Sequence, residues 1–301
     1  FSRSRGLGDV YKRQVGAFMT ENETAYDSQW HVPAINPAAA VPESDDLYYQ
    51  TDQVRYEEES AVFGEVYVQL NDKTEVTLGH RSFDNETTLK GFVGTVWWPN
   101  YILGSTTRSD NVDSLYDGSD SISKVNISYQ ATDDAMVYAT VSEGYRPGGT
   151  NRTTQLGATY DADFLTNYEF GFKTILMDGK LRLNGAVYSM KWDDIQLGWF
   201  DPDISLLGLV DNVGEAKSIG FEIDSKIILS DKVSATFAFA KNDAVLTEDY
   251  VLRGAVEARE NQDLPFTPDK KGNFGLTAEI SDKSRIDFNY AFVDKLSLIH
   301  I

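Results

Sequence analysis

The stretch KSIGFEIDSKIILSDKVSATFAFAK, residues 217–241, shows the pattern on which the chain is built. From Ile219 to Leu229 every second residue is apolar, with Ser225 as the one interruption. A period of two is that of a pleated strand, whose side chains alternate between two faces. The alternation resumes after the polar turn SDK, residues 230–232. The stretch therefore predicts an antiparallel hairpin with one largely apolar face.

Four more hairpins repeat this design. Each consists of two alternating runs joined by a short turn that contains Asp, a residue suited to tight turns because it bonds its own backbone. The runs are SAVFGEVYVQL (60–70) with TEVTLGHRSF (74–83), SKVNISYQ (123–130) with AMVYATVSEGY (135–145), FLTNYEFGFKTIL (164–176) with LRLNGAVYSMKW (181–192), and KGNFGLTAEI (271–280) with SRIDFNYAFV (284–293). With the end of another strand near Val15 to Thr20, we expect about eleven strands.

The connections between the hairpins are long, at roughly twenty to nearly forty residues, whereas most loops in compact soluble domains have about 4 to 6. One such excursion covers about 84–120, and another covers about 243–271. Short turns at one end and long loops at the other are typical of outer-membrane barrels, whose apolar residues face lipid and whose polar residues face the lumen. Because a cut sheet would leave unpaired edges, we predict an all-β, antiparallel up-and-down transmembrane β-barrel that is only partly present.

Composition narrows the remaining classes. The 301 residues include no Cys, which excludes a disulfide scaffold and Cys-based zinc or redox sites. The net charge of -20 argues against binding of nucleic acid, which needs a basic surface. The sequence contains no run of 18 apolar residues, so no transmembrane helix is predicted. Strands of a membrane barrel would not produce such a run, because they give only a weak alternating signal.

The two ends differ from the rest. FSRSRGLGDVYKRQ, residues 1–14, and LSLIHI, residues 296–301, have no strand period and resemble translated sequencing-adaptor sequence. We therefore predict that both ends are non-native and that residues 15–295 form a partial outer-membrane β-barrel, as an internal fragment of a longer protein.

Several segments resemble the barrel of TonB-dependent outer-membrane receptors. The similar segments are residues 60–81, VYATVSEGYRPGGTNR (137–152), NYEFGFKT (167–174) with LRLNGAVYSMKWDDIQL (181–197), NVGEAKSIGFEID (212–224) and LPFTPDKKGNFGL (264–276). The family's motif positions correspond here to the run Gly144 to Gly149 and to Asn212, Gly214, Ala216, Gly220 and Glu222. The resemblance implies a barrel of about 22 strands with a plugged lumen, of which this chain holds about 11 and no plug domain.

The resemblance also implies a function. Such a receptor lies as a monomer in the lipid of the outer membrane of a Gram-negative bacterium and imports a scarce ligand: a ferric siderophore, a corrinoid, haem or an oligosaccharide. A TonB-type energy-coupling protein drives the import through an N-terminal part that this chain lacks. No cofactor and no enzymatic activity are expected.

Aromatic and basic residues in the long loops are the candidates for ligand contact. Aromatic rings would stack on a sugar or siderophore, or else anchor the loops at the membrane interface. Arg146 and Arg152 would pair with an anionic ligand, or else with carboxylates of the acidic loops. The predicted set is Trp97, Trp98, Tyr101, Arg108, Arg146, Asn151, Arg152, Trp199 and Phe200.

Metal binding and catalysis have weaker support. The segments Ser109–Asp113 and Asp117–Asp120 are rich in oxygen ligands for Ca²⁺ but lack the EF-hand spacing, so a solvated loop is the favoured interpretation. His31, His80 and His300 are too scattered for a metal cluster. The chain has no P-loop, no Gly-x-Ser-x-Gly and no His-Glu-x-x-His motif.

Two other functions fit the same pattern. A passive outer-membrane porin or substrate channel would share the barrel but lack the plug and the energy coupling. An extracellular β-rich adhesin or carbohydrate-binding module would share the strands but not the membrane.

Overall fold

The computed structural model describes residues 11–34, 46–95, 110–152, 157–200, 207–252 and 254–296. One antiparallel sheet of 11 strands dominates it, in the order β1-β2-β3-β4-β5-β8-β9-β12-β13-β16-β17. Its strands are β1 (Tyr11–His31), β2 (Leu47–Asn71), β3 (Thr74–Thr95), β4 (Val112–Thr132), β5 (Ala135–Arg146), β8 (Asp163–Leu176), β9 (Leu181–Asp193), β12 (Ala216–Ser230), β13 (Val233–Leu246), β16 (Lys270–Ser281) and β17 (Ser284–Val293). None of the described residues forms a helix, so none of them supplies a helix that crosses a membrane.

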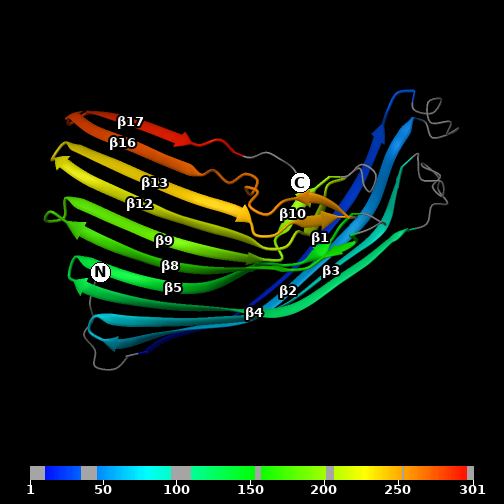
Figure 1. The fold of residues 1–301 in the computed structure, drawn as a ribbon, viewed down its shortest axis with the longest axis horizontal. Coiled ribbons are helices and arrows are strands. Elements are labelled where there is room, and N and C mark those ends of the chain that lie inside the picture. Colours follow the sequence, from blue (N-terminus) through cyan, green and yellow to red (C-terminus); the bar gives the residue numbers. More distant parts are fainter. Residues whose placement is uncertain are drawn as a thin grey trace.

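Three small sheets of two strands each accompany the large one. They are β6 (Gly149–Thr150) with β7 (Thr159–Tyr160), β10 (Gln196–Trp199) with β11 (Leu209–Asn212), and β14 (Tyr250–Leu252) with β15 (Ala255–Ala258). All three come from the long connections, and they gather at the end of the large sheet away from its tight turns (Figure 1).

Tight turns join five pairs of neighbouring strands, and all five lie at one end of the sheet (Figure 1). In the turn after β8, Met177, Asp178 and Gly179 have φ angles of 56°, 55° and 86°. This left-handed region is open to Gly and tolerated by Asp, which explains the Asp-containing turn sequence. The predicted hairpins and the predicted antiparallel sheet are confirmed.

The two faces of the sheet differ in polarity. On one face Lys124 Nζ donates to Glu65 Oε2 at 3.1 Å, and Arg81 Nη2 donates to Glu59 Oε1 at 2.5 Å. The opposite face carries large exposed apolar side chains, among them Val62, Leu78, Val125, Val141, Tyr168, Phe170, Val187, Ile219, Phe221, Phe237 and Phe288. We call the first the inner face and the second the outer face.

Strand β12 follows the predicted alternation. Asp224 on the inner face accepts hydrogen bonds from Asn184 Nδ2 at 3.1 and 3.2 Å. Phe221 on the outer face lies beside Val187 of β9 in register and contacts Phe239 of β13, with ring centroids 5.8 Å apart. The hairpin of residues 217–241 therefore places its apolar row outward and its acidic row inward.

The long connections are shorter than the sequence predicts, which corrects that expectation. β1 continues to His31, β3 continues to Thr95, and β4 starts at Val112, inside the stretch of 84–120 that was interpreted as a loop. Strand pairing is made by the backbone and continues where both faces are polar, so the alternation of side chains is lost before the strands end. Tyr11 to Gln14, which the sequence set apart as non-native, are paired with β2; their origin stays a prediction.

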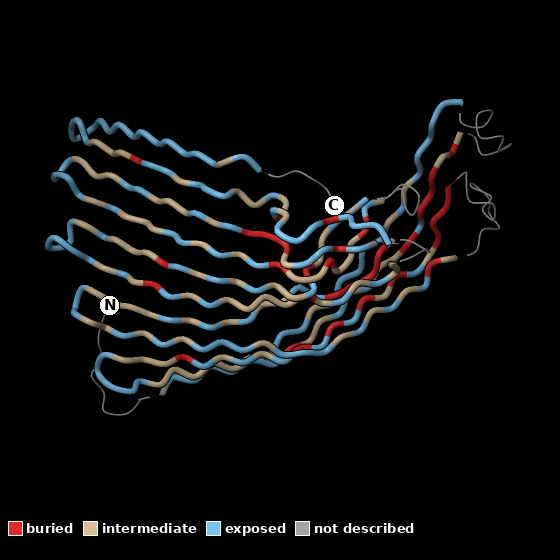
Figure 2. The backbone as a smooth tube through the Cα atoms, in the orientation of Figure 1, coloured by how far each residue is buried: buried red, intermediate tan, exposed pale blue. Residues whose placement is uncertain are grey.

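Fully buried residues are concentrated where the small sheets and the long strand ends pack together (Figure 2). One cluster consists of Ile195, Val213, Ala216, Ala244, Leu246, Tyr250, Ala258 and Leu264, and a second of Tyr49, Leu89, Val93 and Val112. The wall near the tight turns is a single layer whose residues are mostly half-buried or exposed (Figure 2). The connections thus form a packed unit at the end of the wall away from the tight turns.

We expect Phe237→Arg to lower the free energy of unfolding of the full-length protein by about 2–4 kcal/mol, because an arginine near the middle of a lipid-contacting face must be desolvated. Phe237 lies on the outer face, 45% exposed, between Ser225 and Phe274. Denaturant titration in lipid vesicles measures the change. The matched control is Thr236→Arg, at the same depth on the inner face; an equal loss in both variants would contradict the assignment of faces.

Candidate ligand-binding site among the small hairpins

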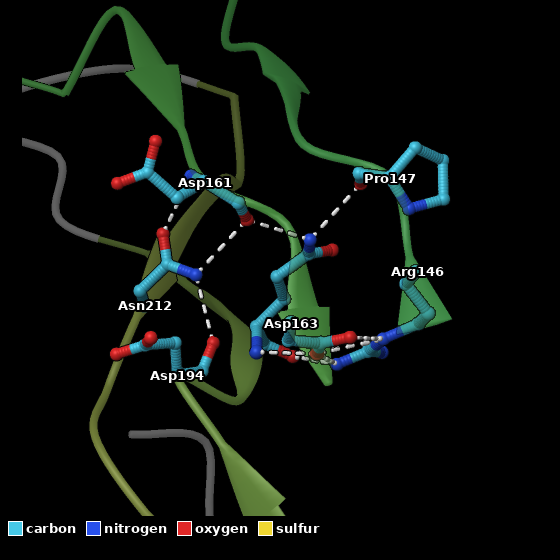
Figure 3. Close-up of polar contacts among 7 residues, drawn as sticks. Arg146, Pro147, Asp161, Asp163, Asp194 and Asn212 are labelled. Atoms are coloured by element: carbon cyan, nitrogen blue, oxygen red, sulfur yellow. Dashed lines mark hydrogen bonds and ion pairs between the residues drawn. The ribbon is translucent and has the colours of Figure 1, made fainter. Parts of the chain in front are cut away.

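Arg146, at the end of β5, is held by Asp163, the first residue of β8. Arg146 Nε donates to Asp163 Oδ1 at 3.1 Å and to Oδ2 at 2.9 Å, and Nη2 also contacts Oδ2 (Figure 3). The Asp163 side chain is 1% exposed and also accepts from the Gln196 backbone N at 2.9 Å. The guanidinium lies 4.8 Å from the Trp192 ring centroid. Arg146 thus has the internal carboxylate partner that the sequence left as the alternative, and its contact with a ligand stays a prediction.

Gln196 of β10 and Asn212 of β11 tie this ion pair to the segment that follows β5 (Figure 3). Gln196 Nε2 donates to the carbonyls of Pro147 at 3.0 Å and Asp161 at 2.8 Å. Asn212 Nδ2 donates to the carbonyls of Asp161 at 3.0 Å and Asp194 at 2.7 Å, and its Oδ1 accepts from Asp161 N at 2.8 Å. These side-chain amides thus link the loops where regular strand pairing is absent.

Asn151 has a similar positioning role. It is buried, at 5% exposure. Its Nδ2 donates to the carbonyls of Gly157 and Val210, both at 2.7 Å, and its Oδ1 accepts from Val210 N at 2.9 Å. Asn151 therefore joins Gly157, which lies ahead of β7, to strand β11.

Arg152, the next residue in the chain, reaches the inner face of β2. Its Nε donates to Gln53 Oε1 at 3.0 Å, and its Nη2 donates to Thr51 Oγ1 at 3.3 Å. The guanidinium carbon lies 3.9 Å from the centroid of the Tyr26 ring, close enough for a cation–π contact. Burial lowers the pKa of Arg152, and the neighbouring Arg55 acts in the same direction.

Arg55 lies on the other side of this cluster. Its guanidinium carbon is 5.5 Å from the same Tyr26 ring, and its Nη2 donates to the Thr150 carbonyl at 2.7 Å. Neither Arg55 nor Arg152 forms an ion pair with a carboxylate of the described residues. We call these two residues the arginine pair.

Buried donors surround the arginine pair without partners. Arg55 Nε, Gln53 Nε2 and Thr150 Oγ1 make no hydrogen bond within the part of the chain that the structure describes, and the Gln53 and Thr150 side chains are each 1% exposed. Since buried polar groups are nearly always hydrogen-bonded, unused donors beside two guanidinium groups favour a ligand rich in anionic oxygen.

A cavity of about 760 Å³ lies between the β10–β11 hairpin and residues 264–267. Its aromatic walls are Trp192, Phe200 and Phe266, and Arg146 borders it. Phe200, which the sequence predicts as a ligand contact, is 56% exposed there, and Trp192 Nε1 is buried without a partner among the described residues. Such a cavity suits the apolar or aromatic part of a small molecule.

The other predicted contacts are not placed. Trp97, Trp98, Tyr101 and Arg108 lie outside the described residues, and of Trp199 only the backbone, in β10, is described. Their contact with a ligand stays a prediction.

The acidic segment considered for Ca²⁺ is mostly strand. Ser109 lies outside the described residues, whereas Asp113, Asp117 and Asp120 belong to β4. Asp113 Oδ1 pairs with Lys90 Nζ at 3.7 Å. Among the described residues no three acidic or histidine side chains converge to hold a metal ion.

The residues that β1 and β2 contribute to the site were not predicted from the sequence. Tyr26, Thr51, Gln53 and Arg55 all lie in strand segments that were interpreted as polar connections or as strand starts without function. A signal was present, because Thr51, Gln53 and Arg55 share one parity of β2 and hence one face.

An 11-stranded antiparallel sheet with its tight turns at one end and packed loops at the other is the wall of a β-barrel. The model of the family described as "TonB dependent receptor-like, beta-barrel" matches residues 3–293. The chain belongs to this family of TonB-dependent receptors, whose members are outer-membrane receptors for siderophores or metals. The resemblance seen in the sequence is confirmed.

Three relatives illustrate the likeness. The metal-pseudopaline receptor CntO of Pseudomonas aeruginosa is 29% identical over 133 residues, which is 44% of this chain and 18% of that protein. The ferrichrome outer membrane transporter/phage receptor of Escherichia coli K12 is 25% identical over 198 residues, or 64% of this chain and 23% of that protein. The ferric yersiniabactin uptake receptor FyuA from Yersinia pestis matches with a TM-score of 0.73 at 17% identity, covering 95% of this chain and 40% of that one.

This chain therefore spans less than a quarter of the length of the two curated relatives. The fold and the family are those of transport receptors.

We expect Asp163→Asn to speed amide hydrogen exchange in β10 and in residues 157–163 by about 10- to 100-fold, because a hydrogen bond to a charged group contributes about 1.5–3 kcal/mol. The control is Asp193→Asn, which removes the exposed Lys191–Asp193 pair of 2.7 Å. There we expect less than about a fivefold change, since exposed ion pairs contribute about 0–1 kcal/mol. Similar rates in both variants would mean that Asp163 does not hold the loops.

Proposed function

We propose that this chain forms part of the barrel of an outer-membrane receptor of a Gram-negative bacterium that imports an anionic metal chelate of the siderophore type. The observation that carries the proposal is the arginine pair. Arg55 and Arg152 lie side by side on the inner face with unused buried donors around them, in a chain with 47 acidic and 27 basic residues. Carboxylate or other anionic oxygens of a chelate would pair with the two guanidinium groups.

The relatives support this class of ligand. Their names refer to metal-pseudopaline, ferrichrome and ferric yersiniabactin. All three names concern metals or metal chelates, which among the ligand classes considered from the sequence favours a chelate over a corrinoid, haem or an oligosaccharide.

The aromatic cavity completes the proposed contacts. A chelate held through its anionic oxygens by the arginine pair would place a less polar part toward the β10–β11 hairpin and the 264–267 segment, where Phe200 and Trp192 lie. In this proposal Arg146 and Asn151 position the hairpins, and Arg152 and Phe200 contact the ligand. TonB-type energy coupling would act through the part of the receptor that precedes this barrel segment.

Transport by the full-length receptor is the first test. Expressed in a strain without its own siderophore receptors, it should import ferric chelates that carry free carboxylates, and import should stop when the energy-coupling protein is deleted. Uptake that persists without the coupling protein would favour the passive porin. Uptake of haem, corrinoid or oligosaccharide but of no ferric chelate would overturn the ligand class.

Arg152→Gln should weaken binding of those ferric chelates to the purified full-length receptor by about 10- to 100-fold, because each charge-assisted hydrogen bond contributes about 1.5–3 kcal/mol. Isothermal titration measures the affinity. Arg182→Gln is the matched control: Arg182 lies on the inner face near the tight turns, 61% exposed and 3.8 Å from Asp224, and its loss should leave the affinity unchanged. Equal effects of the two substitutions would contradict the proposal that Arg152 contacts the ligand.

A further inference from the structure

A lysine follows the apolar row of the outer face in four consecutive strands of the large sheet. Along β9, β12, β13 and β16, moving away from the tight turns, the apolar side chains on this face end at Val187, Ile219, Phe239 and Phe274. The first charged residues beyond them are Lys191, Lys217, Lys241 and Lys270, all exposed. We call these four residues the lysine border.

The lysines of the border face each other in pairs. Lys217 lies directly opposite Lys191, and Lys241 lies directly opposite Lys270. Like charges directly opposite on neighbouring strands are destabilising, since their Cβ atoms are only about 5 Å apart. The sheet therefore holds two repulsive pairs at the same edge of its apolar face.

Among the described residues, ion pairs offset the charge of one of the four lysines. Lys191 Nζ pairs with Asp193 at 2.7 Å and with Glu215 at 3.3 Å. Lys217, Lys241 and Lys270 form no ion pair within the described part of the chain, although Asp243 is next along the same face of β13. The Lys241–Lys270 pair therefore has no ion pair of its own among the described residues, which is a local conflict of the kind that marks functional positions.

The rest of the wall shows that this border is not a general feature of the barrel. In β2, β3, β4 and β5 the first charged residues beyond the apolar part of the outer face are acidic: Glu58, Asp84, Asp117 and Glu143. Lysines that served only to anchor strands at the membrane interface would be expected in both groups of strands. Lysine is instead the first charged residue beyond the apolar row only in β9, β12, β13 and β16 among the strands compared.

The border lies at the level of the outer leaflet. Short turns of outer-membrane barrels are periplasmic, so the opposite end of the apolar face meets the outer head groups. Basic residues there attract anionic lipid head groups. We propose that the lysine border binds a phosphorylated lipid of the outer leaflet: Lys241 and Lys270 share a phosphate, Lys217 contacts a neighbouring one, and Phe239 and Phe274 pack against the acyl chains.

Lipid binding to the purified full-length receptor tests this proposal, which uses the outer-membrane location but not the identity of the imported ligand. The probe is an acylated disaccharide lipid with two phosphates, titrated into the detergent-solubilised receptor and followed by native mass spectrometry. The variant K217Q/K241Q/K270Q should bind it at least tenfold more weakly, at about fivefold for each lysine. The control K180Q/K232Q/K283Q makes the same change of charge in the tight turns and should bind as the unchanged receptor does.

Three results would overturn the proposal: equal binding by the border variant and the unchanged receptor, an equal loss in the turn control, or equal binding of the same lipid without its phosphates. Uptake of ferric chelates by the border variant at the normal rate shows that it is folded. If the unchanged receptor fails to bind the lipid but imports ferric chelates normally, only the lysine-border proposal is contradicted. If the unchanged receptor does not import ferric chelates, the proposed function is contradicted instead.

Discussion

Backbone hydrogen bonding between neighbouring strands is the interaction on which the rest of this structure depends. β2 pairs with β1 on one side and with β3 on the other, residue by residue, from Tyr49 to Val68. Hydrocarbon offers no partner for backbone groups, so a wall in a membrane has to satisfy them all within the ladder. Because the ladder satisfies the backbone groups, the wall near the tight turns can be a single layer of strands. Buried clusters form where the long connections pack together.

The same ladder explains how much of the fold the sequence could predict. Where lipid lies on one side and the lumen on the other, each strand needs opposite polarity on its two faces, and residues 217–241 show this period. Beyond the apolar part both faces are polar: Glu57, Glu58 and Glu59 follow one another in β2 although they alternate between faces. Pairing continues there without a signal in the side chains, so the strand ends could not be predicted.

The site was predictable in its loop residues but not in its contacts. Arg146 follows a motif, and its two possible partners, a ligand or an internal carboxylate, could be stated; only the fold shows that Asp163 lies opposite it in register. The role of Arg55 could not be predicted from the sequence because it depends on Arg152. Arg152 is distant in the sequence but lies over the same Tyr26 ring. The motif residue Asn212 is explained by its hydrogen bonds to Asp161 and Asp194, which hold the hairpins.

The excess of acidic residues bears on both faces of the wall. Acidic residues outnumber basic ones by 47 to 27, so a lysine or arginine could readily find a carboxylate within the protein. Arg81, Lys124 and Arg146 do so on the inner face. The arginine pair on the inner face, and Lys217, Lys241 and Lys270 on the outer face, form no ion pair among the described residues. In the two proposals each group meets an anion from outside the protein: a ligand in the lumen and a phosphate in the outer leaflet.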